Sequence, residues 1–159
     1  MENSKKRNSC SHGKTPGTVH PTLTLLNRNH TEYPSSPEKA VIETFENAFP
    51  GRDYVITFDC PEFTSLCPVT NQPDFGHITI RYIADRLCVE SKSLKLYLFS
   101  FRNHNTFHEE AVNRILSDLV TACSPRWMEV TGVFRPRGGI ALSITAEEKK
   151  KKNAKTSKH

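Results

Sequence analysis

The 159-residue sequence contains no long hydrophobic run, and no stretch approaches the roughly 18 apolar residues that a membrane span requires. Its N-terminal residues are basic, but no apolar segment follows them, so we expect no secretory signal and a cytoplasmic protein without a membrane partner. The composition, 36% hydrophobic and 25% charged, is typical of a globular domain with some additional polar length. The chain is long enough for one domain with a single core.

The cysteines also lack the spacing of a metal site or a disulfide framework. Their number is odd, no C-x-x-C pair is present, and the intervals are irregular. Because we expect a reducing compartment, we expect neither structural disulfides nor a bound metal. Cys60, Cys88 and Cys123 are most simply interpreted as packed or idle thiols, and the sequence leaves open whether any of them pairs with Cys67.

The net charge of +5 belongs to the ends of the chain. Residues 1–35 carry five Lys or Arg against two Glu, residues 147–159 carry six Lys against two Glu, and residues 36–146 are left with 11 basic and 13 acidic residues. A basic nucleic-acid surface on the domain is therefore not indicated, and we expect no direct nucleic-acid partner. We interpret residues 1–36 as a mostly flexible extension, 37–146 as the folded domain and 147–159 as a basic disordered tail.

Hydrophobic periodicity predicts an α+β domain in the order β-β-α-α-β-β. Strands are predicted at 53–60, 77–85, 126–134 and 138–146, helices at 90–104 and 106–123, and a further short helix, capped by Ser36, within 37–49. The expected architecture is a four-stranded antiparallel sheet with two helices on one face. The first two strands form a hairpin through a long loop.

That loop, "FTSLCPVTNQPDFGH" at residues 63–77, is too rich in turn-forming residues for a regular helix or strand. It carries Cys67 and Asp74. A free thiol with a pKa of about 8.5 is only a few per cent thiolate at neutral pH, so a nucleophile needs a nearby base or positive charge. A neighbouring carboxylic acid could protonate the group that the sulfur attacks. The alternative is an idle loop thiol and a turn residue after Pro73.

Two further motifs have both a chemical and a structural interpretation. In "VESKSLK", Glu90 and Ser91 fall near a helix start, where free backbone N–H groups attract anions, and Lys92 and Lys95 share a face suited to phosphate. The alternative is a capped, solvated helix face.

In "NTFHEE", Thr106 and Glu109 have the spacing of a capping box, which explains both residues without any function. His108, in contrast, titrates near neutral pH, and Phe107 could stack on a flat ring.

Taken together, three segments closely resemble the NADPH-dependent 7-cyano-7-deazaguanine reductases, the short QueF type of nitrile reductase. They are "CPEFTSLCPVTNQPDFGHITIRYIAD", "VESKSLKLYLFSFRNHNTFHEEAVNRI" and "FRPRGGI", and the resemblance runs from about residue 52 to residue 145. It implies the tunnelling fold, shared with GTP cyclohydrolase I, for the catalytic domain at 37–146. It also implies reduction of the nitrile of 7-cyano-7-deazaguanine to an aminomethyl group by two NADPH, in the biosynthesis of the tRNA modification queuosine.

The resemblance implies a role for each motif residue. Cys67 is the nucleophile that forms a thioimide, and Asp74 is the proton donor. His108 is a catalytic and substrate-lining residue, and Glu109 is a buried carboxylate that recognises the guanine-like edge of the base. The remaining substrate-binding residues are Val89, Glu90, Ser91 and Phe107, and the NADPH-binding residues are Ser91, Lys92, Ser93 and Lys95, with Arg135 and Arg137 as weaker phosphate candidates.

The resemblance also implies a homo-oligomer of stacked rings, a decamer, with active sites between subunits, and a sheet with two open edges favours such pairing. One departure is Asn71, where the family typically has glycine; asparagine tolerates left-handed backbone geometry, so the turn could survive. Two other functions remain open: a zinc-dependent cyclohydrolase of the same fold, and a non-catalytic purine-binding module.

Overall fold

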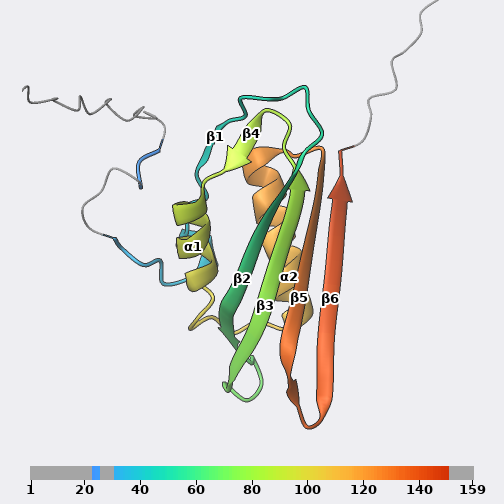
Figure 1. The fold of residues 1–159 in the computed structure, drawn as a ribbon. Helices are drawn as coiled ribbons and strands as arrows, with labels where there is room; N and C mark the ends of the chain where they lie inside the picture. The colour runs from blue at the N-terminus through green and yellow to red at the C-terminus, as the bar shows by residue number, and fades with distance from the viewer. Residues whose placement is uncertain (1–22, 26–30, 151–159) are drawn as a thin grey trace, which may run out of the picture.

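A four-stranded antiparallel sheet forms the frame of the molecule (Figure 1). The computed structural model describes residues 23–25 and 31–150. The sheet has the order β2-β3-β5-β6, and its strands are β2 (Val55–Leu66), β3 (Pro73–Ile83), β5 (Trp127–Arg137) and β6 (Ile140–Lys149). The predicted class, order of elements and antiparallel sheet are confirmed. The last strand runs three residues into the segment predicted as a tail.

Two helices complete the predicted order. α2 (His108–Cys123) crosses one face of the sheet, and α1 (Ser91–Phe99) lies alongside β2 (Figure 1). The apolar stripe of α2 repeats at helical spacing, as predicted, and meets the inward residues of the strands. The fully buried members of this core include Val112, Ile115 and Leu119 of α2 and Ile78, Ile80, Met128 and Val130 of the sheet. No helix among the described residues is long and apolar enough to cross a membrane.

The prediction of a helix within 37–49 is wrong. Only Pro37–Lys39 forms a single 3-10 turn, and Ser36 makes no side-chain cap. The chain then extends into β1 (Thr44–Glu46), which pairs with β4 (Leu87–Val89) in a separate two-stranded sheet. Branched and aromatic residues in this segment favour an extended backbone, and pairing with β4 supplies the hydrogen bonds that a helix would have provided.

The long loop predicted at 63–77 is also wrong. β2 continues to Leu66 and β3 begins at Pro73, so only residues 67–72 connect the two strands. Pro73 is tolerated because it is the first residue of its strand.

A register shift between Cys60 and Phe63 interrupts the β2–β3 pairing. Before the shift Phe58 turns inward and Asp59 is exposed, whereas after it the odd-numbered Phe63 and Ser65 are buried. A bulge inserts one extra residue and therefore reverses which residues face the core.

Candidate functional site

Cys67 is held at the start of the six-residue connection between β2 and β3. Its backbone N–H donates to the Gln72 carbonyl at 2.9 Å, and its own carbonyl accepts from the Asn71 N–H at 2.9 Å. Asn71 has a φ of 56°, the left-handed conformation that the sequence led us to expect it to tolerate. The Asn105 amide donates to the Cys67 carbonyl at 3.2 Å and to Asn71 Oδ1 at 2.9 Å. The turn is therefore held by hydrogen bonds within residues 67–72 and by Asn105 from outside it.

The segment before α2 is joined to the strand before Cys67. The Leu66 N–H donates to the His104 carbonyl, and the Thr106 N–H donates to the Leu66 carbonyl, both at 3.0 Å. This pairing brings the start of α2, with His108, to the β2–β3 hairpin that holds Asp74. No sequence signal indicated it, and Asn105 was not recognised as a site residue.

The predicted capping box at the start of α2 is wrong. Phe107 is the N-cap residue and makes no side-chain cap, and the Thr106 hydroxyl contacts Glu110 at 3.4 Å instead of serving Glu109. With Glu109 not used in a cap, its side chain remains available at the exposed first turn of the helix.

The Cys67 thiol has the electrostatic surroundings of a nucleophile. Hydrogen bonds from the Thr70 hydroxyl and from the N–H groups of Thr70 and Val69, with a further one from Arg137, lower its pKa to about 6. Each of these donors stabilises the thiolate. Burial instead raises the pKa of Cys60 to about 11 and that of Cys123 to about 12.

Asp74, the second residue of β3, is 5% exposed. Arg137 Nε lies 3.0 Å from Asp74 Oδ1, and His108 Nε2 lies 3.2 Å from Asp74 Oδ2. Since Arg137 also hydrogen-bonds to the Cys67 thiol, its guanidinium bridges the two residues. The sequence suggested Arg137 only as a phosphate ligand, so this position between thiol and carboxylate is new.

His108 rests on an aromatic support. Its ring stacks on Phe134 with centroids 3.9 Å apart and an angle of 15° between the planes. Two glycines leave room for Phe134: a Cβ on Gly76 would lie 2.9 Å from the ring, and one on Gly132 would lie 2.9 Å from the ring and 2.7 Å from Val112. The absence of side chains at Gly76 and Gly132 therefore allows the Phe134 ring to lie where it supports His108 near Asp74.

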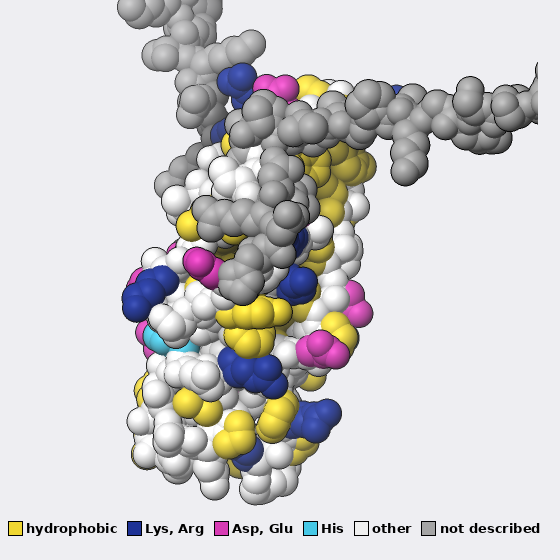
Figure 2. Space-filling model, turned by 90° about the vertical axis from the view of Figure 1, so that its left-hand side faces the viewer, with side chains coloured by type: hydrophobic (Ala, Val, Ile, Leu, Met, Phe, Trp, Pro, Cys, Tyr) yellow, Lys and Arg dark blue, Asp and Glu magenta, His cyan; other side chains and the backbone are white. Residues whose placement is uncertain are grey.

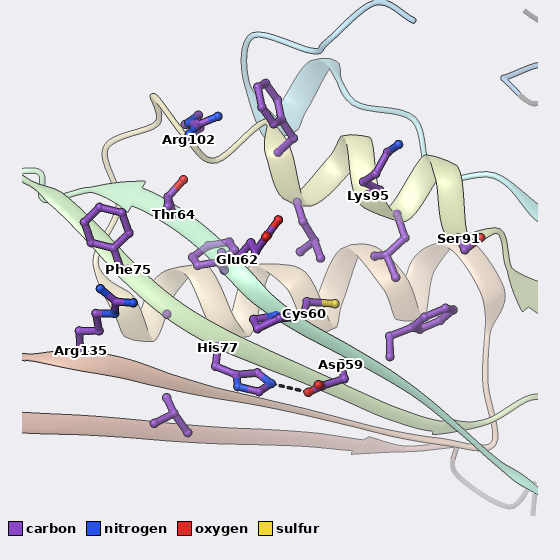
Figure 3. A pocket seen from close by; sticks show the side chains of 18 residues that line it. Asp59, Cys60, Glu62, Thr64, Phe75, His77, Ser91, Lys95, Arg102 and Arg135 are labelled. Atoms are coloured by element: carbon purple, nitrogen blue, oxygen red, sulfur yellow. Dashed lines mark hydrogen bonds and ion pairs between the residues drawn. The ribbon is translucent and has the colours of Figure 1, made fainter.

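A second group of predicted residues lines a separate cavity of about 920 Å³ between α1 and β2 (Figure 3). Ser91 and Lys95 project from α1, and Arg135 reaches the cavity from the sheet. Arg102, which the sequence did not single out, also lines it. Figure 2 shows Lys and Arg side chains interspersed with hydrophobic ones on this side of the molecule. The guanidinium group of Arg102 lies over the Phe99 ring, and that of Arg135 lies over the Phe75 ring.

The N-terminus of α1 is not free for an anion, which corrects that expectation. The Glu90 carboxylate accepts from the N–H groups of Lys92 and Ser93, both at 2.7 Å, and so caps the helix itself. Ser93 is fully buried: its hydroxyl accepts from the Glu43 N–H and donates to the Glu90 carbonyl. The Lys92 ammonium donates to the Leu25 carbonyl.

Within one chain, the residues predicted to bind the base do not form a closed pocket. Glu109, expected to be buried, is exposed, and Phe107 is 56% exposed. Val89 is buried and its N–H donates to the Tyr82 hydroxyl. The start of α1 lies beside β4, whereas the β2–β3 connection lies at the opposite end of the sheet (Figure 1). The two motifs are therefore far apart in a single chain.

Comparison with known proteins identifies the family. A family described as QueF-like protein matches residues 73–153. An NADPH-dependent 7-cyano-7-deazaguanine reductase of Bacteroides thetaiotaomicron is 58% identical over 120 residues, which cover 76% of this chain and 79% of the relative. This chain belongs to the QueF-like family. Reductases of the same name from Streptococcus thermophilus (58% identical, 74% of the relative covered) and Neisseria gonorrhoeae (55% identical, 76% covered) match the same share of the chain.

A solved structure supports the fold of this QueF-like protein. The apo form of the archaeosine synthase QueF-Like superposes with a TM-score of 0.55 at 22% identity, covering 58% of this chain and 91% of the other. At this identity the match speaks for the fold alone. Within the described residues, no three His, Cys, Asp or Glu side chains gather where they could hold a metal ion.

Proposed function

We propose that this QueF-like protein is a nitrile reductase that converts 7-cyano-7-deazaguanine to 7-aminomethyl-7-deazaguanine at the expense of two NADPH, in queuosine biosynthesis. The observation that carries the proposal is the Cys67 thiol, with a pKa of about 6, joined through Arg137 to the buried Asp74. Relatives 55–58% identical carry the name of this reductase. We expect the substrate to be a free base and not a nucleic acid, and we expect a cytoplasmic enzyme because the product is used in tRNA modification.

The residues around Cys67 fit the addition of a thiol to a nitrile. The Cys67 thiolate donates an electron pair to the nitrile carbon, and Asp74 gives its proton to the nitrogen, which yields a neutral thioimide and an Asp74 carboxylate. Arg137 and Thr70 stabilise the thiolate before attack and again when sulfur is expelled. When bound, NADPH supplies the hydride that each reduction requires. His108, supported on Phe134, is placed to exchange protons with Asp74.

The cavity beside α1 fits the cofactor. Its volume of about 920 Å³ lies at the upper end of the usual range for ligand pockets, and Lys95, Arg102 and Arg135 provide positive charge for phosphate groups. Ser91 adds a hydroxyl. Lys92 would have to release the Leu25 carbonyl to bind the cofactor. The Ser93 hydroxyl is not available to the cofactor, because it donates to the Glu90 carbonyl at the start of the helix.

We further propose that each active site is completed by a second subunit. Cys67 and the start of α1 lie at opposite ends of the sheet in one chain, and β2 and β6 are the outer strands among the described residues. Pairing of outer strands between chains would extend the sheet into a ring. A neighbour's Val89–Ser91 segment could then cover Phe107 and Glu109, and burial would strengthen recognition of the base by this carboxylate. Stacked rings forming a decamer are the assembly that we expect.

The decisive experiment is intact-protein mass spectrometry with the nitrile substrate and no NADPH. We expect an adduct of the mass of the substrate on Cys67, no adduct in Cys67→Ala, and slower formation in Asp74→Asn. Cys123→Ala is the matched control and should still form the adduct, because burial keeps that thiol protonated. An adduct that persists in Cys67→Ala, or none in the wild type, contradicts the proposed mechanism.

Measuring NADPH consumption and metal content distinguishes the reductase from the purine-binding module and the zinc-dependent cyclohydrolase. With the nitrile substrate we expect two NADPH oxidised for each product formed. A purine-binding module would bind the base but oxidise no NADPH. A zinc-dependent cyclohydrolase would contain stoichiometric metal, which elemental analysis of the purified protein would show.

A further inference from the structure

Two buried side-chain atoms have no hydrogen-bond partner among the described residues: Ser65 Oγ and His108 Nε2. Most buried polar groups in proteins are paired, so each exception requires an explanation. Both atoms belong to the neighbours of Asp74. His108 Nε2 lies 3.2 Å from Asp74 Oδ2, without the alignment of a hydrogen bond. Ser65 is the residue of β2 that pairs directly with Asp74 of β3.

The register of the hairpin places the Ser65 hydroxyl within reach of Asp74. Residues directly opposite in an antiparallel pair point to the same side of the sheet, with Cβ atoms about 4.5–5.5 Å apart. Ser65 is 0% exposed and Asp74 is 5% exposed, so both side chains face the interior. The bulge after Cys60 causes this orientation, because without the register shift Ser65 would face outward.

The carboxylate has room for a further donor. A carboxylate can accept about four hydrogen bonds, and Asp74 receives Arg137 on Oδ1 and is approached by His108 at Oδ2. The Ser65 hydroxyl can rotate about its Cα–Cβ bond without moving the strand. Serine is therefore able to change its hydrogen bonding as the charge on Asp74 changes.

We propose that Ser65 is a positioning residue for proton transfer, whose hydroxyl donates to the Asp74 carboxylate once Asp74 has protonated the substrate nitrogen. This inference rests on the proposed function. In the step, sulfur forms a bond to the nitrile carbon, one C–N π bond breaks, and the Asp74 proton moves to nitrogen. The negative charge that leaves sulfur thus ends on Asp74, where the Ser65 hydrogen bond stabilises it.

An unpaired buried hydroxyl has a cost in stability, which gives the inference a distinctive signature. A buried polar group without a partner destabilises the fold, whereas an apolar side chain of similar size at the same position does not. Ser65→Ala should therefore melt at the same temperature as the wild type or higher, by up to about 5 °C. A merely structural serine would show the opposite change.

The test measures the rate of thioimide formation by intact-protein mass spectrometry over a range of pH. We expect Ser65→Ala to slow adduct formation about ten- to hundredfold, the loss typical of a hydrogen bond to a charged group. The limb of the pH–rate profile that belongs to Cys67, identified independently from thiolate absorbance, should stay in place. Ser65→Thr, which keeps the hydroxyl, should restore part of the rate.

Two further variants make the test specific. Ser143→Ala, at an exposed position of β6, is the matched control and should react like the wild type. In an Asp74→Asn background, Ser65→Ala should have little additional effect, because the charge that it stabilises is absent. If Ser65→Ala forms the adduct at the wild-type rate, or slows it equally in the Asp74→Asn background, the inference is wrong. A wild type that forms no adduct would instead contradict the proposed function itself.

Discussion

At the residue scale, the pKa of Cys67 is lowered by groups that surround its sulfur, most of them within its own turn. Val69 and Thr70 supply N–H groups, Thr70 adds a hydroxyl, and Arg137 reaches the same sulfur from the end of β5. Because the lowered pKa is about 6, the thiol is mainly ionised at neutral pH and becomes protonated as the pH falls through 6. Cys60 and Cys123, whose pKa values are raised by burial, stay protonated under the same conditions.

Alkylation by iodoacetamide should therefore select Cys67. At pH 7 we expect it to be modified far faster than Cys60 or Cys123, with half-maximal rate near pH 6, as followed by peptide mass spectrometry. Thr70→Ala removes the donor that lowers the pKa most, so the midpoint should move to higher pH, by up to about one unit.

Thr121→Ala, at an exposed position of α2, provides the control for this substitution and should leave the midpoint unchanged. An unchanged midpoint in Thr70→Ala would show that the hydroxyl does not stabilise the thiolate.

At the element scale, the β2–β3 hairpin and strand β5 position the candidate site residues. The hairpin holds Cys67 and Asp74, and β5 provides Phe134, on which His108 stacks. Phe134 occupies the space over Gly76 and Gly132, and its ring carries His108 at the start of α2. Cys67 and His108 could be proposed as site residues from the sequence, because their motifs are local. The glycines and Phe134 were missed, since their role depends on which strands are neighbours.

Gly132→Ala should disturb this support. Its Cβ would lie 2.7 Å from Val112 and 2.9 Å from Phe134, so we expect a loss of about 1–3 kcal/mol in the free energy of unfolding, measured by urea denaturation. Displacement of the Phe134 ring should also slow adduct formation on Cys67.

Gly51→Ala is the matched control, because nothing lies within 4 Å of the added Cβ. It should unfold like the wild type. Equal stability of the two variants would contradict the close packing around Phe134.

At the scale of the whole molecule, the two groups of site residues lie apart. The Cys67 turn occupies one end of the sheet, and the start of α1, with Ser91, lies towards the other (Figure 1). Lys95 and Arg135 line a cavity that does not include Cys67 or Asp74. A single chain therefore keeps these two groups of residues apart.

Mixing inactive subunits should restore activity if sites form between chains. Cys67→Ala and Lys95→Ala subunits, dissociated and reassembled in equal amounts, should regain up to about a quarter of the wild-type rate of NADPH oxidation, because some interfaces combine two intact halves. Native mass spectrometry would verify that the subunits have mixed.

Cys67→Ala mixed with Asp74→Asn is the control and should not exceed the low rate of Asp74→Asn alone, since both changes lie in the same cluster of one chain. Activity that fails to return in the first mixture, despite verified exchange, would place each whole site within one chain.

Elements with strong periodicity, and the candidate residues in local motifs, could be predicted from the sequence alone. The apolar stripe of α2, the alternation in β3 and the motif around Cys67 are all readable within a few neighbouring residues. The helix predicted within 37–49 failed for the complementary reason: its extended backbone is stabilised by β4, which lies some forty residues later. Local propensity is weak compared with pairing of that kind.

The spatial arrangement of these candidate residues, in contrast, depends on contacts between distant parts of the chain. The bulge in β2 turned Ser65 inward, the pairing of Leu66 with residues 104–106 carried His108 to Asp74, and the end of β5 placed Arg137 between thiol and carboxylate. The physical reason is that each of these contacts joins residues distant in sequence, and their geometry depends on strand register. A shift of one residue would turn every side chain on that strand to the opposite face.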